Sequence, residues 1–172
     1  MHETPEDLDA LQELLDRSFA AGGPHLRSII TPDRRLSAAE VAERLQGMCL
    51  LVVATATGDG RPLTAPEDGI FYRGAFHFSS GNNSVKYRHL RRQPAVSATH
   101  LPGEELCVTV HGRGEFVDVA DAAHAGFRQT LVDIYAPRYG DSWADFMEES
   151  SFYVRIAAEK MFTFHMPPEM LS

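Results

Sequence analysis

The sequence predicts a single α+β domain built around an antiparallel β-barrel, and three observations favour this fold class. First, about six strand-like segments are joined mainly by short turns, and such hairpins join antiparallel strands because parallel pairs need long crossovers. Second, several segments are long, and a sheet of that size tends to curl and close, which removes exposed edges. Third, 172 residues with 44% hydrophobic and 23% charged side chains are typical of one globular domain with a sizeable core.

The chain begins with a segment of helical character. Thr4 can cap a first helix whose leucines recur at helical spacing, and Gly-Gly-Pro at 22–24 ends it before a polar loop. An S-x-x-E capping box at Ser37 opens a second, short helix. We therefore expect residues 1–47 to form a helical extension that packs on a barrel of residues 48–172, within one structural domain overall.

The rest of the chain alternates between strand and turn signals. The run at 48–56, rich in Val and Leu, is predicted to be a buried strand, and Gly112 and Gly114 indicate a bulge or a close backbone approach. Short helices are expected at 84–92, after Asp121, and at 141–147. The expected strand segments are 48–56, 61–66, 70–72, 75–78, 95–101, 106–119, 152–156 and 161–164.

Charge and composition exclude several classes of function. The net charge of −8 disfavours nucleic acid and anionic membranes as partners. The acidic first residues are unlike a signal peptide, and the longest apolar run is far short of the ~20 residues that span a bilayer. Cys49 and Cys107 lie in apolar strands, so we expect buried free thiols in a cytoplasmic protein. The histidines show no metal-binding spacing, so no metal is expected.

The strongest local signal for a ligand site is a loop of small polar residues at 79–84 that feeds a basic helix. Of the 16 Lys and Arg residues of the chain, four fall between Lys86 and Arg92. Hydroxyl groups, the free N–H groups of a helix start and a lysine together favour a phosphate. A plain loop followed by a solvated helix face is the alternative, and the pattern alone leaves both open.

Two further segments carry weaker signals. Residues 61–66 have Pro62 and Pro66 at their ends, which is typical of an edge strand. Such a strand leaves backbone groups free to pair with a heterocyclic ring, although a plain edge strand is the more common structure. Cys107, Thr109 and His111 share one face of the strand at 106–119, and that face points either into a pocket or toward solvent.

Taken in order, these stretches resemble the pyridoxamine 5'-phosphate oxidase-like family, the FMN-binding split barrels. The resemblance rests on three stretches: LVVAT followed by GDGRP, FHFSS followed by SVKYRHLRRQPAV, and VTVHGRGE. It implies a six-stranded antiparallel split β-barrel with flanking helices that forms a homodimer. It also implies two cofactor sites across the dimer interface.

The family pattern assigns roles to particular residues by analogy. The isoalloxazine ring of FMN would lie along Leu63, Thr64, Ala65 and Pro66. The phosphate and ribityl end would meet Ser79 and Ser80, with Ser84 and Lys86 beside them, and Cys107 falls where members place a Gln near the ring.

The resemblance also sets the functions to be compared. Val85 replaces an Arg of the true oxidases, and the Arg- and Trp-bearing closing motif is missing, so oxidation of pyridoxamine phosphate itself is not expected. We expect an FMN-dependent oxidoreductase acting on a small-molecule substrate. A reductase that uses the deazaflavin F420 is the first alternative, because both cofactors carry a ribityl phosphate. A flavin- or haem-binding protein without turnover is the second.

Overall fold

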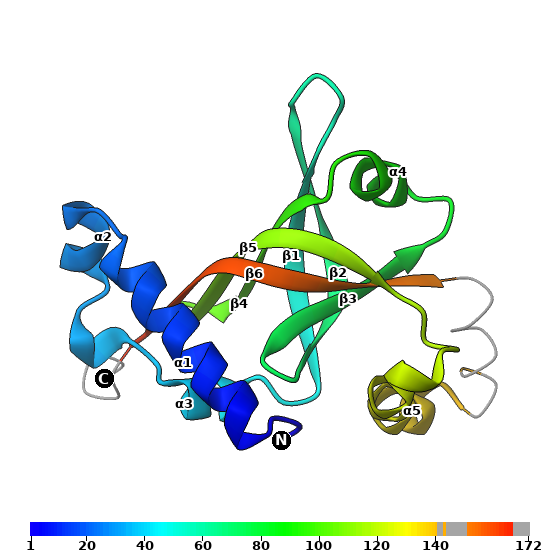
Figure 1. The fold of residues 1–172 in the computed structure, drawn as a ribbon, viewed down its shortest axis with the longest axis horizontal. Coiled ribbons are helices and arrows are strands. Elements are labelled where there is room, and N and C mark those ends of the chain that lie inside the picture. The colour runs from blue at the N-terminus through cyan, green and yellow to red at the C-terminus, as the bar shows by residue number, and fades with distance from the viewer. Residues whose placement is uncertain (141–142, 144–150, 167–172) are drawn as a thin grey trace.

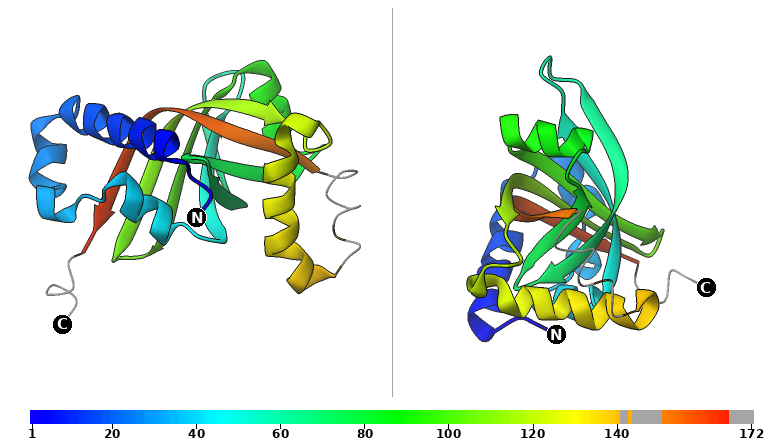
Figure 2. Two further views of the ribbon diagram at one scale, coloured as in Figure 1. Left: turned by 60° about the horizontal axis from the view of Figure 1, so that its bottom comes forward. Right: turned by 90° about the vertical axis from the view of Figure 1, so that its right-hand side faces the viewer.

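A computed structural model describes residues 1–140, 143 and 151–166, and within them six strands close into one barrel (Figure 1). Neighbouring strands pair antiparallel in the order β1-β2-β3-β6-β5-β4. Helices flank the barrel at its ends and on one face (Figure 2). This confirms the predicted fold class. The strands are β1 (Met48–Ala56), β2 (Pro62–Tyr72), β3 (Ala75–Gly81), β4 (Ala95–Gly103), β5 (Leu106–Val117) and β6 (Ser151–His165).

The helices begin where the capping signals predict. The capping box predicted at Ser37 forms, with the Ser37 N–H donating to Glu40 Oε2 at 2.8 Å. Thr4 caps the first helix as predicted and also forms a capping box, in which its N–H donates to Asp7 Oδ2 at 2.8 Å. The loop predicted between these two helices is wrong in part, because it holds a short helix and a 3₁₀ turn. None of the described helices is both long and apolar enough to cross a membrane. The helices are α1 (Pro5–Ala20), α2 (Pro24–Ile29), η1 (Pro32–Arg34), α3 (Ala38–Arg44), α4 (Val85–Arg92), η2 (Ala122–His124) and α5 (Ala125–Tyr139).

The helical extension closes one end of the barrel, where α1 lies along β6 (Figure 1). Leu11 and Leu15 of α1 belong to the same buried cluster as the barrel interior, and each such leucine contributes roughly 1.5–3 kcal/mol. The backbone polar groups beneath the helix are satisfied. Ser18 Oγ accepts the N–H of Met161 at 3.0 Å, and Thr163 Oγ1 accepts that of Leu36 at 3.0 Å.

Two predicted strand breaks are absent from the structure. The segments at 61–66 and 70–72 are one strand, β2, because the edge position tolerates Pro66: β3 pairs only with Gly69–Tyr72, so the earlier part of β2 has β1 alone beside it. The segments at 152–156 and 161–164 are likewise one strand, β6. Its pairing with β5 continues through a register shift between His111 and Gly112. The helix predicted at 141–147 lies, except for position 143, outside the described residues.

The prediction that β1 is a buried strand is wrong for half of its side chains. Cys49 and the other inward residues fill the barrel, but Leu50 and Val52 point outward and are 54% and 50% exposed. The two cysteines differ in the same way. Cys49 is buried, which raises the pKa of its thiol to about 11, whereas Cys107 points outward from β5 and is only half-buried. The expectation that both thiols are buried is therefore corrected for Cys107.

Candidate cofactor site

The segment predicted to carry the ring lies on a strand arm that extends beyond the barrel. The β1–β2 hairpin projects past the strands around it (Figures 1 and 2). In this arm Leu63 pairs with Thr55 and Pro66 pairs with Val52. Because β3 joins β2 only from Gly69 onward, residues 63–66 have a described strand on one side alone. Their other backbone edge is free to meet a ligand.

The predicted phosphate residues gather around the start of α4. Ser79 and Ser80 end β3 and pair with Tyr153 and Phe152, so they belong to the strand rather than to the predicted loop. Ser84 caps α4: its Oγ accepts the N–H of Tyr87 at 3.2 Å. All three serines are half-buried. Half-buried hydroxyls next to the N–H groups of a helix start suit an anion with several acceptor oxygens.

An ion pair connects this helix to the strand arm. Lys86 Nζ contacts Glu67 Oε1, and the two side chains are only 18% and 12% exposed. The sequence pattern assigns Lys86 to a phosphate and does not single out Glu67. Strand alternation places Glu67 on the inward side with Ala65 and Gly69, but nothing in the sequence indicates which basic residue of α4 would contact it.

The other cations of α4 are also engaged, each with a different segment. Arg88 Nη1 donates to Asn83 O at 3.2 Å, so its guanidinium lies against the loop that leads into Ser84 and adds positive charge there. Arg92 Nη2 donates to Ala56 O at 3.3 Å, and Arg91 stacks over the ring of Phe116. Of the basic cluster, Lys86 and Arg88 therefore lie at the candidate phosphate site.

Cys107 stands apart from the other predicted site residues. It lies on β5, which is separated from β2 by two strands in either direction around the barrel. Its Sγ lies 3.6 Å from Thr109 Oγ1, on the same outward face. Within one chain the structure thus brings Leu63–Pro66, the three serines and Lys86 toward one end of the barrel, and leaves Cys107 on the opposite wall.

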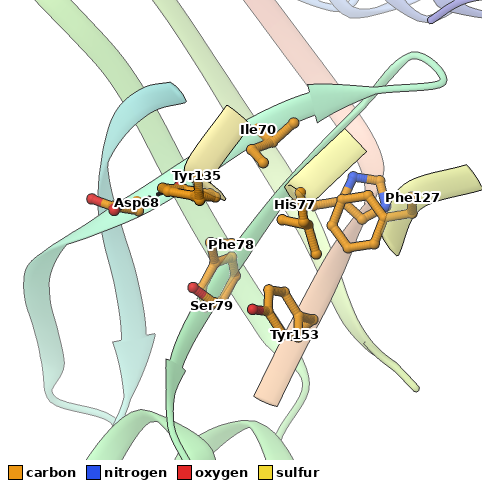
Figure 3. Close-up of a pocket in the computed structure, with 9 residues that line it drawn as sticks. Asp68, Ile70, His77, Phe78, Ser79, Phe127, Tyr135 and Tyr153 are labelled. Carbon is orange, nitrogen blue, oxygen red and sulfur yellow. Dashed lines mark hydrogen bonds between the residues drawn. The ribbon is translucent and has the colours of Figure 1, made fainter. Parts of the chain in front are cut away.

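A second cluster of polar groups lies beside Ser79, under α5 (Figure 3). The Tyr135 hydroxyl donates to Asp68 Oδ2 at 3.5 Å, and the His77 ring lies 4.4 Å from that of Phe127. His77 Nδ1 lies 3.1 Å from Ala75 O, so this nitrogen carries the proton and donates. The space left between these residues is about 10 Å³, room for one water molecule and not for a heterocyclic ring.

Burial favours the uncharged forms of His77, Tyr135 and Tyr153 in this cluster. Desolvation, with smaller contributions from Arg155 and His124, lowers the pKa of His77 to about 4. Desolvation also raises the pKa of Tyr135 and of Tyr153 above the ordinary tyrosine range, and the Asp68 carboxylate adds to the shift of Tyr135. The cluster is therefore a closed packing seam beside the candidate site.

Comparison with known proteins places this barrel in a family. The family model of pyridoxamine 5'-phosphate oxidase matches residues 37–162, and no curated protein matches the chain. Among solved structures, the conserved hypothetical protein Rv2991 from Mycobacterium tuberculosis is 22% identical, with a TM-score of 0.64 over 78% of this chain and 88% of that one.

Two further structures share the fold. The haem storage protein HutZ from Vibrio cholerae is 17% identical, with a TM-score of 0.59 over 73% of this chain and 93% of that one. An FAD-binding protein from Mesorhizobium loti is 23% identical, with a TM-score of 0.55 over 76% and 93%. The family model matches most of the chain, from residue 37 to residue 162. The chain therefore belongs to the pyridoxamine 5'-phosphate oxidase family.

Proposed function

We propose that this protein binds FMN and acts as an oxidoreductase on a small organic molecule. The observation that carries the proposal is the junction of the β1–β2 arm with α4, where the Lys86–Glu67 ion pair joins the two. The free edge of residues 63–66 belongs to the arm, and Ser79 and Ser84 lie near the end of β3 and at the start of α4. A molecule with a flat ring at one end and a phosphate at the other fits such an arrangement.

Each part of the junction has a distinct task in this proposal. Leu63, Thr64, Ala65 and Pro66 orient the isoalloxazine ring against the backbone of β2, while Ser79, Ser80, Ser84 and Lys86 bind the ribityl and phosphate end. FMN, when bound, supplies hydride transfer at its ring. In the cofactor-free protein Glu67 pairs with the Lys86 ammonium and therefore competes with the phosphate for it.

We further propose that the protein is a homodimer. Leu50, Val52 and Leu101 lie on the outward faces of the adjacent strands β1 and β4 and are 50–59% exposed. An apolar patch of this kind marks an interaction surface, and a two-fold symmetric contact between copies is the commonest way to cover one. The second copy would also bring its Cys107 toward the ring, which one chain alone does not do.

The experiment compares ligands that differ by one phosphate. FMN and riboflavin share the ring, so the ratio of their dissociation constants reports the phosphate site. We expect FMN to bind more tightly than riboflavin, and Lys86→Ala to weaken FMN by roughly 10- to 150-fold, as a lost charge-assisted hydrogen bond of about 1.5–3 kcal/mol implies. The melting temperature of the cofactor-free protein separates this effect from loss of fold.

Glu67→Gln is the matched variant because it removes the competing charge and keeps the shape of the side chain. If Lys86 binds the phosphate, this variant strengthens FMN and leaves riboflavin unchanged. Tighter binding of F420 than of FMN would make the protein a deazaflavin enzyme on the same phosphate site. A Soret band in the purified protein would make it a haem protein, and binding of neither FMN nor F420 at micromolar concentration would reject the proposal.

A further inference from the structure

A groove on the outside of the barrel borders the segment assigned to the flavin ring but is lined by none of the residues assigned to the cofactor. It measures about 340 Å³ and is lined by residues of β1, β2, β4, β5 and β6, including Ala56 and Pro62 beside the turn of the β1–β2 arm. A volume of this size is that of a site for a small organic ligand. Its side-chain lining includes Ala54, Ala56, Pro62, Ser97, His111 and Glu159.

The floor of the groove is flat and apolar because its outward residues are small. Ala54 and Ala56 are the outward positions of β1 after Val52, and their methyl groups leave room that larger side chains would fill. Ser97 continues this floor on the neighbouring strand, β4, where it is the partner of Ala54. A surface of small side chains on paired strands suits the face of a planar ring.

A β-bulge sets the polar wall of the groove. His111 pairs with Lys160 and Gly112 pairs with Ala158, so Glu159 has no partner on β5. A bulge of this kind re-aims the side chain of the extra residue, and Glu159 lines the groove. Gly112 is required for it, because a Cβ there would lie 2.1 Å from Ala157 O.

The polar side chains that line the groove include Ser97, His111 and Glu159. His111 Nδ1 and Ser97 Oγ lie 2.8 Å apart, which fixes the imidazole ring and leaves its Nε2 free of that bond. Glu159 is the one residue with a full negative or positive charge among the described residues that line the groove. The chain as a whole carries a net charge of −8, which adds to the attraction for a cation.

We infer that this groove binds a planar aromatic ligand that carries a cationic N–H group, with the ring on the alanine floor and the N–H group directed at the Glu159 carboxylate. The groove borders the proposed ring segment, since Ala54 is the cross-strand partner of Thr64. The identification of this ligand as the substrate rests on the proposed function. The binding of such a ligand in the groove is independent of the proposed function.

The test uses three probes with the same ring and different charge. Benzamidine is cationic, benzamide neutral and benzoate anionic, and each is titrated into the cofactor-free protein while amide chemical shifts are recorded. Benzamidine is expected to shift the amide signals of Ala56, Ser97 and Glu159, with a dissociation constant on the order of 1 mM for so small a ligand. Benzamide is expected to bind more weakly, and benzoate more weakly still.

Two variants and a control decide whether the groove is the site. Glu159→Gln is expected to weaken benzamidine by roughly three- to tenfold and to leave benzamide unchanged. Ala56→Leu fills the floor from an outward position and is expected to weaken both ligands. Glu104→Gln makes the same change of charge at an exposed residue outside the groove and is expected to change nothing.

Three results would overturn the inference. They are equal binding of benzamidine and benzoate, benzamidine binding that is unchanged in Glu159→Gln, and shifts confined to residues outside the groove. Light scattering is recorded in the same titration, because a probe that dissociates a dimer would show that a second copy covers the groove instead of a ligand. Failure of FMN to bind leaves all of these readouts intact, so the two proposals fail separately.

Discussion

The barrel has two outward faces whose strands alternate in the same way but whose surroundings differ. On β2, β3 and β6 the outward residues Ile70, His77 and Tyr153 are 3–5% exposed, because α5 packs over them with Phe127. On β1 and β4 the outward leucines and valine remain half exposed, and no described element covers them. We call these the covered face and the bare face. Strand alternation therefore predicts which side chains point outward, but it does not predict what they meet.

The two faces also differ in the space that they leave. Under α5 the cavity is about 10 Å³, whereas the groove at the end of the bare face measures about 340 Å³. The covered face is complete within one chain and contributes to folding stability. The bare face and its groove are available to a second copy and a ligand.

The largest effect is expected on the covered face. Phe127 is 3% exposed and contacts the rings of Tyr72 and His77, so Phe127→Ala should lower the free energy of unfolding by about 3–5 kcal/mol. Leu50→Ala on the bare face is the matched control and should cost under about 1 kcal/mol in the monomer. Urea unfolding of both variants gives the comparison, and equal losses would contradict the division.

The second effect is a pH dependence that belongs to the covered face. The folded pKa of His77 is about 4, against an ordinary value of 6.5. The unfolded chain therefore binds a proton at this residue first, and folding stability falls as the pH drops from 6.5 toward 4. Wild type should lose about 3 kcal/mol over this window relative to His77→Asn, because one pKa unit corresponds to about 1.4 kcal/mol.

His77→Asn keeps an N–H donor for Ala75 O and cannot titrate, so it isolates the contribution of this one residue. The measurement is chemical unfolding at several pH values between 4 and 7. Parallel curves for wild type and variant would mean that His77 is accessible to protons in the folded protein, and that α5 does not seal this face.

The third effect tests how the groove on the bare face is built. Gly112→Ala places a Cβ against Ala157 O in the β5–β6 bulge, which we expect to cost about 2 kcal/mol of stability. It should also reduce benzamidine binding, because the bulge aims Glu159. Gly23→Ala is the control, since an added Cβ there meets nothing within 4 Å. A Gly112→Ala protein with wild-type stability would show that the two strands separate easily at this point.

The smallest effect concerns association through the bare face. Val52→Thr keeps the shape and the strand preference of the side chain but adds a hydroxyl, so the monomer should be nearly unaffected. In a symmetric dimer two hydroxyls would lose water, at a total cost of about 1.4 kcal/mol or more, which is roughly a tenfold weaker dimer. Analytical ultracentrifugation of wild type and variant measures the change. Identical dimer dissociation constants for the two proteins would show that the interface lies on another surface.

The local signals of the sequence were sufficient for the elements themselves. Capping residues at Thr4 and Ser37 placed two helix starts, because such bonds join residues only a few positions apart. The turn at Arg73-Gly74 was likewise local, and both residues adopt the positive φ that such a hairpin turn requires. Local chemistry of this kind survives in any fold that contains the segment.

The errors arose where pairing between distant segments decided the outcome. The breaks predicted near Pro66 and at 157–160 are absent, because β1 and β5 provide continuous partners for β2 and β6. Proline and polar residues interrupt a pattern in the sequence, but an edge position or a bulge accommodates them in the sheet. Cys107 was expected to be buried because its neighbours in the sequence are apolar. In the sheet those neighbours face inward, whereas Cys107 faces outward.

The sequence by itself determined the fold class, the strand alternation and a polar loop leading into a basic helix, because each depends on residues close together in the chain. Only the tertiary structure decided which of those residues meet. Lys86 forms an ion pair with Glu67, nineteen positions away on another element. A shift in strand register directs Glu159 into the groove that His111 also lines. Contacts of this kind depend on how the barrel closes and on where α5 packs, and no short-range pattern encodes that geometry.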